Sequence, residues 1–71
     1  MNKTVEIFTE FINLDALLKW ASLVTTGGEA KAAIQEGEVR LNGVTETRRT
    51  KKIVSGDVVS YNGTDIRVVR K

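Results

Sequence analysis

Basic side chains gather in one short stretch of the chain, residues 48–52. Four of these five residues are cationic: Arg48, Arg49, Lys51 and Lys52. Charges of one sign this close repel one another unless an anion neutralises them, and phosphate does so well because its oxygens match the guanidinium fork of arginine. We interpret the segment as a candidate polyanion site, to which Arg40 on a neighbouring predicted strand adds a charge. A solvated basic loop that discourages pairing between sheet edges is the alternative.

Two adjacent glycines, Gly27 and Gly28, stand directly before a predicted helix. The first N–H groups of a helix lack partners within it and lie at the positive end of its dipole, so they favour an anion. Glycines would let a phosphate approach without meeting a side chain, and Lys31 can reach back over the turn. The alternative is a tight connection between two helices with Lys31 in solvent, and Glu29 at the same helix end weighs against phosphate. The pattern is not a P-loop.

Residues that support common catalytic chemistries are missing. The chain has no cysteine and no histidine, which excludes disulfides, zinc sites built on thiolate or imidazole, and Ser–His or Cys–His nucleophile pairs. Asp15, Asp57 and Asp65 have no spacing that predicts a pair of catalytic carboxylates. We therefore expect a protein that is not an enzyme and that needs no cofactor or metal.

The length of 71 residues predicts a single domain, residues 1–71, with a thin core. Its charge is uneven: residues 48–71 carry seven cations and two anions, whereas residues 1–24 and 25–47 carry net charges of −1 and −2. This asymmetry favours a polyanionic partner. No apolar run reaches the roughly 20 residues of a membrane span, and the N-terminus has no signal-peptide pattern, so we expect a cytoplasmic protein.

Hydrophobic periodicity predicts a strand at residues 4–8 and then two helices. The stripe of the first helix is Leu14, Leu17, Leu18 and Ala21, with Asn13 as N-cap. Trp20 and Tyr61 could each stack on a nucleic-acid base. Because Trp20 lies at the margin of this stripe, we expect it to pack in the core instead. A capping box of Thr26 and Glu29 predicts the start of the second helix, and Gly37 its end.

Two Asn-Gly pairs, Asn42-Gly43 and Asn62-Gly63, predict β-hairpins. Val39 and Leu41 alternate with charged residues before the first turn, and Ile66 and Val68 form one face after the second. The predicted fold is α+β: two packed helices, arranged as a helix–turn–helix, against a small, mostly antiparallel β-sheet.

Four short motifs follow one another between Leu14 and Val59. They are Leu14-Asp15, the run from Ala30-Lys31 to Gly37, the run from Val39 to Asn42-Gly43, and Gly56-Asp57. In this order and spacing they resemble the S-four-type RNA-binding domain, the alpha-L motif first described in a ribosomal protein of the small subunit. The chain is similar to the small, free-standing bacterial members of that family.

The resemblance implies a non-catalytic protein that holds structured RNA by its backbone phosphates. The implied RNA is ribosomal RNA, with tRNA as a further possibility, and the implied partner is the ribosome or a pre-ribosomal particle. The implied surface consists of Lys19, Thr26, Gly27, Gly28, Lys31, Arg40, Arg48, Arg49, Lys51 and Lys52. Many members have arginine in place of Gly27 and Asn13, which implies a different affinity or target. A protein-docking module and a DNA-binding protein are the alternatives for the same basic surface.

Overall fold

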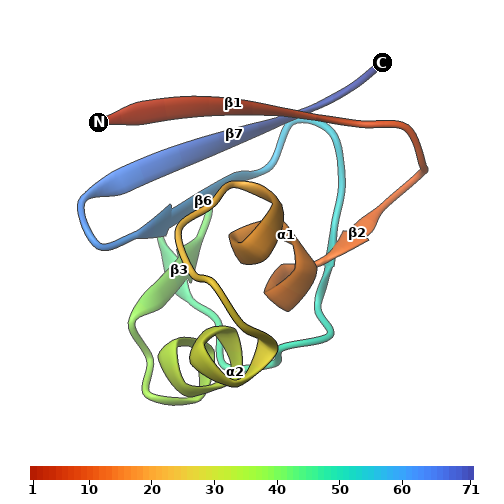
Figure 1. The fold of residues 1–71 in the computed structure, drawn as a ribbon. Helices are drawn as coiled ribbons and strands as arrows, with labels where there is room; N and C mark the ends of the chain where they lie inside the picture. The colour runs from red at the N-terminus through yellow and green to blue at the C-terminus, as the bar shows by residue number, and fades with distance from the viewer.

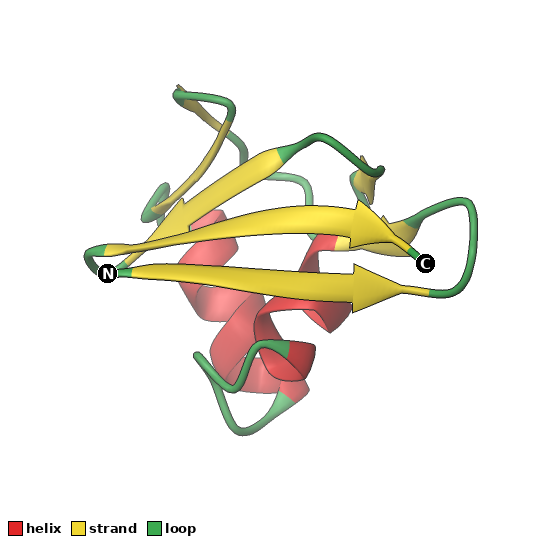
Figure 2. Ribbon diagram, turned by 90° about the horizontal axis from the view of Figure 1, so that it is seen from above, coloured by secondary structure: helices red, strands yellow, loops and turns green.

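Two helices pack against one face of a five-stranded β-sheet in the computed structural model, which describes residues 1–71 (Figures 1 and 2). In chain order the elements are β1 (Asn2–Ile7), β2 (Ile12–Asn13), α1 (Leu14–Trp20), α2 (Gly27–Gln35), β3 (Val39–Leu41), β4 (Val44–Thr45), β5 (Lys52–Ile53), β6 (Val58–Tyr61) and β7 (Thr64–Arg70). The expected α+β class is confirmed.

The sheet has the strand order β1-β7-β6-β3-β4, and β2 and β5 form a separate antiparallel pair. Neighbours in the large sheet are antiparallel except β1 and β7, which run parallel from Asn2 opposite Asp65 to Ile7 opposite Arg70. Figure 1 shows this first and last strand side by side at the top of the molecule. The expectation of a mostly antiparallel sheet is therefore confirmed, with one parallel pair at its edge.

Both predicted helices begin and end close to the expected residues. At the start of α2 the Thr26 hydroxyl accepts from the Glu29 N–H at 3.1 Å. The Glu29 carboxylate accepts from the Thr25 N–H at 3.3 Å, one residue before the position that a capping box predicts. Gly37 has a φ of 78° and donates to the Ile34 carbonyl at 3.1 Å, which closes the helix in a Schellman motif together with the bond from Glu38 to Ala33.

Both predicted hairpin turns are confirmed. Asn42 and Gly43 have φ values of 51° and 85°, and Asn62 and Gly63 have 51° and 79°, as a type I′ turn requires. The Asn42 amide also donates to the Asp57 carboxylate at 3.1 Å and accepts from the Val58 N–H at 2.9 Å. Two of the short motifs, Asn-Gly and Gly-Asp, are thus joined in space.

The core between the helices and the sheet contains 15 buried side chains, all of them apolar. The predicted helical stripes and strand faces supply most of them, including Leu14, Leu17, Leu18, Ala30, Ala33, Ile34, Val39, Ile66 and Val68. Trp20 is not among them: it is 62% exposed, so the prediction that it packs in the core is wrong. Its side chain lies at the end of α1 and lines two open hollows between this helix and β1.

Candidate nucleic-acid interface

The backbone of the basic segment, residues 48–52, is fixed against the start of α1. Asn13 is the N-cap residue, but its side chain makes no capping hydrogen bond. Instead, Leu14 donates its N–H to the Lys51 carbonyl and Asp15 to the Arg49 carbonyl, each at 3.0 Å. The segment ends in β5, which pairs with β2 and anchors itself through the fully buried Ile53. The cationic side chains therefore extend from a rigid backbone.

Arg48 is neutralised within the protein, because it forms a two-pronged ion pair with Glu46. The Arg48 Nε lies 3.0 Å from Glu46 Oε2 and its second nitrogen 3.2 Å from Oε1. These side-chain bonds, with a third from the Arg48 N–H, lower the pKa of Glu46 to about 2. The same carboxylate raises the pKa of Arg48. Glu46 is only 13% exposed and Arg48 69%, so the arginine shields the carboxylate and carries little free charge.

The other cations of the basic segment form no salt bridge, although the charge of Lys51 also helps to lower the pKa of Glu46. Arg48 and Glu46 form the single salt bridge of the molecule. Arg49 is exposed and Lys51 half-exposed, whereas the Lys52 ammonium lies 4.8 Å above the ring of Phe11. Arg49 and Lys51 are thus free to bind an anion. Lys52 can bind an anion only if its ammonium leaves the Phe11 ring or contacts the ring and the anion at the same time.

No packing contact within the protein requires glycine at the start of α2. A Cβ on Gly27 would have no atom within 4 Å, and one on Gly28 would meet only the Thr26 hydroxyl at 4.0 Å. Neither glycine has a positive φ, so the tight-connection alternative has no geometric requirement behind it. The N–H groups of Gly27 and Gly28 also donate to no protein acceptor. Backbone donors at the positive end of the helix are therefore open to an anion.

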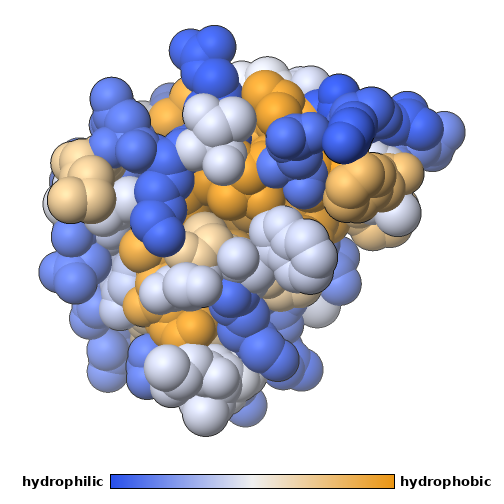
Figure 3. Space-filling view, turned by 45° about the horizontal axis from the view of Figure 1, so that its top comes forward, coloured by the Kyte–Doolittle hydropathy of each residue, from blue (hydrophilic) through white to orange (hydrophobic).

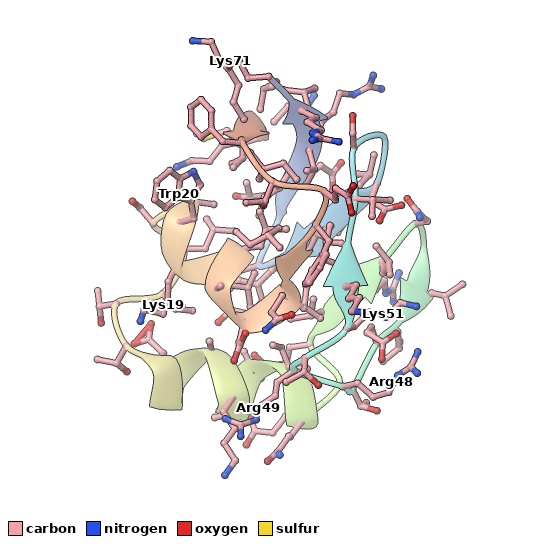
Figure 4. The ribbon with its side chains drawn as sticks, turned by 90° about the vertical axis from the view of Figure 1, so that its right-hand side faces the viewer. Lys19, Trp20, Arg48, Arg49, Lys51 and Lys71 are labelled. Carbon is pink, nitrogen blue, oxygen red and sulfur yellow. The ribbon has the colours of Figure 1, made fainter.

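Two further lysines belong to the helices. Lys31 is exposed on α2, on the side away from the buried Ala30, Ala33 and Ile34. Lys19 is exposed at the end of α1, and Figure 4 shows it beside the connection that leads into α2. The same view shows Arg49 beside α2 and Lys51 farther along the basic segment, next to β5. We call the surface that carries Lys19, Lys31, Arg49, Lys51 and the Gly27-Gly28 backbone the helical face.

Arg40 lies apart from the helical face. In β3 it alternates with the buried Val39 and the half-buried Leu41, so its side chain points to the outer surface of the sheet. There it sits opposite Ser60 of β6 and borders a shallow hollow with Tyr61. Tyr61 itself is half-buried against the core. The structure therefore holds the basic segment against the start of α1 and leaves Arg40 on the outer surface of the sheet.

Comparison with known proteins shows the family to which the chain belongs. A family model described as the S4 domain matches residues 5–69. YbcJ of Escherichia coli (strain K12), whose name proposes RNA binding, is 43% identical over 58 residues that span 82% of this chain and 83% of YbcJ. RlbA of Bacillus subtilis (strain 168), whose name proposes a role in ribosome maturation, is 40% identical over 63 residues, 89% of each protein.

A solved structure also superimposes on the fold. The solution structure of E. coli YbcJ, described as containing an alpha-L motif involved in RNA binding, covers 96% of this chain and 85% of its own. Its TM-score is 0.69 at 37% identity. The present chain has no helix that is long and apolar enough to cross a membrane, and no cluster of its acidic side chains could hold a metal ion.

Proposed function

Because the chain belongs to the S4 domain family, we propose that it is a non-catalytic protein that binds structured RNA, with ribosomal RNA as the favoured target. The observation that carries the proposal is the helical face, which presents cations that form no salt bridge and the N–H groups of Gly27 and Gly28, which have no acceptor within the protein. The names of YbcJ and RlbA, which refer to RNA binding and to ribosome maturation, support the same proposal. In this proposal α1, the connection and α2 act as a helix–turn–helix that holds the RNA.

Affinity in this proposal comes from phosphates rather than from base edges. One phosphate accepts from the bare N–H groups at the start of α2, and the Lys31 ammonium closes over it. A second meets the guanidinium fork of Arg49, whose backbone is held by its bond to Asp15. Each phosphate neutralised in this way contributes about 0.7–0.9 to the slope of log affinity against log salt. Shape then decides which RNA places its phosphates at both positions.

Titrations at several salt concentrations test the proposal, with a folded ribosomal RNA fragment, duplex RNA and duplex DNA as ligands. We expect tight, salt-dependent binding of the folded RNA in preference to DNA. Lys31→Ala and Arg49→Ala should each weaken binding and reduce the salt slope by about one. Arg67→Ala is the matched control, because it removes the same charge from the outer surface of the sheet, between the buried Ile66 and Val68.

Other results would contradict the proposal in distinct ways. Equal, weak binding of all three nucleic acids would leave only a generic basic surface. If no RNA bound at any salt concentration, a protein-docking module would become the better account. If Arg67→Ala weakened binding as much as Arg49→Ala, the helical face would be the wrong surface, and the side that carries Arg40 would replace it.

A further inference from the structure

Two large aromatic side chains, Phe8 and Trp20, stand in solvent beside a hollow at the edge of the sheet. Phe8 is 68% exposed and Trp20 62%. They border a hollow of about 510 Å³ between β1 and the end of α1, and a smaller one of about 230 Å³ adjoins it on the side of Ile12. Figure 3 shows apolar surface in the middle of this side of the molecule, framed by hydrophilic side chains. A contiguous apolar patch framed by polar side chains is a feature of ligand-binding and interaction sites.

Charged groups around the aromatic hollow indicate what kind of molecule fits. The Lys71 ammonium lies 5.9 Å from the centroid of the Phe8 ring. Lys3 also lines the hollow, but its ammonium is tied to the Ala21 carbonyl at 2.8 Å. Glu6 is the single acidic residue of the lining. The hollow thus offers a flat apolar ring, an exposed cation at the rim and one acidic residue.

A nucleotide matches these three groups. Its base stacks on the exposed indole, its phosphate meets a cation at the rim, and its amino group can donate to a carboxylate. Trp20 follows Lys19 at the end of α1, and Figure 4 shows both on the same flank of this helix, with Trp20 toward the aromatic hollow and Lys19 toward the connection into α2. One RNA can therefore occupy both surfaces.

We propose that an unpaired nucleobase of the bound RNA stacks on Trp20 in the aromatic hollow, with its phosphate on Lys71. This inference rests on the proposed RNA-binding function and adds a requirement to it: the preferred RNA carries a bulged or looped-out nucleotide next to a helical stem. Phe8 closes the other side of the hollow, and Glu6 favours bases that carry an amino group. Phe8 and Lys71 lie outside the stretch from Leu14 to Val59 that contains the family motifs, so this contact is additional to the phosphate contacts.

The test uses Trp20 as its own probe, because it is the one tryptophan of the chain. The protein is titrated with two RNAs that share one stem, one with a bulged adenosine and one fully paired. We expect the bulged RNA to quench the Trp20 emission strongly and to bind about tenfold more tightly than the paired stem. Trp20→Ala and Phe8→Ala should each weaken binding of the bulged RNA by about five- to tenfold and leave the paired stem unaffected. Trp20→Phe should restore part of the loss.

The outcomes separate the two proposals. Base stacking is wrong and phosphate binding stands if three results occur together. Lys31→Ala weakens the binding of both RNAs, Trp20→Ala leaves the affinity for both RNAs unchanged, and the Trp20 emission of the parent protein stays constant when the bulged RNA is added. If neither RNA binds to the parent protein, both proposals are overturned. Because Trp20 and Phe8 are exposed, their substitution should leave the circular dichroism spectrum and the unfolding midpoint unchanged, which excludes loss of the fold as a cause.

Discussion

Replacing Gly27 and Gly28 by alanine should stabilise the protein and weaken its binding of RNA. Both residues have helical backbone angles, and an added methyl group meets no backbone and no side chain closer than 4.0 Å. Alanine in place of a helical glycine is worth roughly 0.5–1 kcal/mol. We take about 0.5 kcal/mol for each position in the first turn, so the double variant should gain about 1 kcal/mol, or about 4–8 °C in Tm for a domain of this size.

The same two methyl groups should obstruct the phosphate. Cβ atoms of a helix tilt toward its N-terminus, so the methyl groups would narrow the approach to the free N–H groups. A hydrogen bond from a backbone N–H to a charged acceptor contributes about 1.5–3 kcal/mol. Loss of one such bond therefore weakens RNA binding at least about tenfold, since 1.4 kcal/mol corresponds to a factor of ten.

Urea unfolding followed by Trp20 emission measures the stability, and an RNA titration of the same samples measures the affinity. Ala32→Gly is the matched control: this exposed position lies within α2 but away from its start. It should lose about 1 kcal/mol of stability and bind RNA as the parent does. A double alanine variant that is more stable and binds RNA with unchanged affinity would refute the role of the bare backbone.

Three further changes test other contacts, each by urea unfolding. Glu46→Gln should lower the free energy of unfolding by about 0.5–1 kcal/mol at pH 7. Because the pKa of Glu46 falls from 4.5 to about 2 on folding, the difference in stability between the variant and the parent should be full above pH 4.5 and should vanish as the pH approaches about 2. A difference that stays constant over this pH range would contradict the ion pair. Asp57→Ala should cost about 1–2 kcal/mol, because its carboxylate accepts from the Val54 N–H at 2.9 Å and from Asn42; no loss would show that water replaces these bonds. Lys3→Met should cost about 1 kcal/mol by leaving the Ala21 carbonyl at the end of α1 without its ammonium donor, and an unchanged midpoint would refute that cap.

Features set by a few neighbouring residues could be predicted from the sequence. The Asn42-Gly43 and Asn62-Gly63 turns depend on residues that tolerate a positive φ, and Gly37 ends α2 for the same reason. The Thr26 cap likewise involves a bond over three residues. In each case the interaction that decides the structure joins residues only a few positions apart in the sequence.

Features that join distant residues could not be predicted in this way. The short pair of β2 and β5 depends on Ile12 meeting Ile53, and no local pattern marks either partner. The exposure of Trp20 depends on what lies beside α1, which helical periodicity cannot tell. Arg40 belongs to the other side of the sheet because β3 pairs with β6 and β4 in a register that places Val39 inward.

The charge compensation in the basic segment could not be predicted from the sequence either. From composition alone the segment appears as four equal cations, but Arg48 curls back onto Glu46, two residues earlier. The Lys52 ammonium also makes a cation–π contact with the ring of Phe11. The charge available to a partner is therefore smaller, and more concentrated on Arg49 and Lys51, than a count of residues indicates.

The parallel pairing of β1 with β7 also fixes the order in which the chain can fold. Contacts within the helical pair and the two hairpins join near neighbours and can form in microseconds. Bringing Asn2 beside Asp65 instead closes a loop of about 60 residues, at a chain-entropy cost of about 4 kcal/mol. During synthesis β1 is made before β7 and has no partner strand until β7 has emerged from the ribosome. We therefore expect β1 to be the last strand to join the sheet, and the emergence of β7 to be the event that lets it do so.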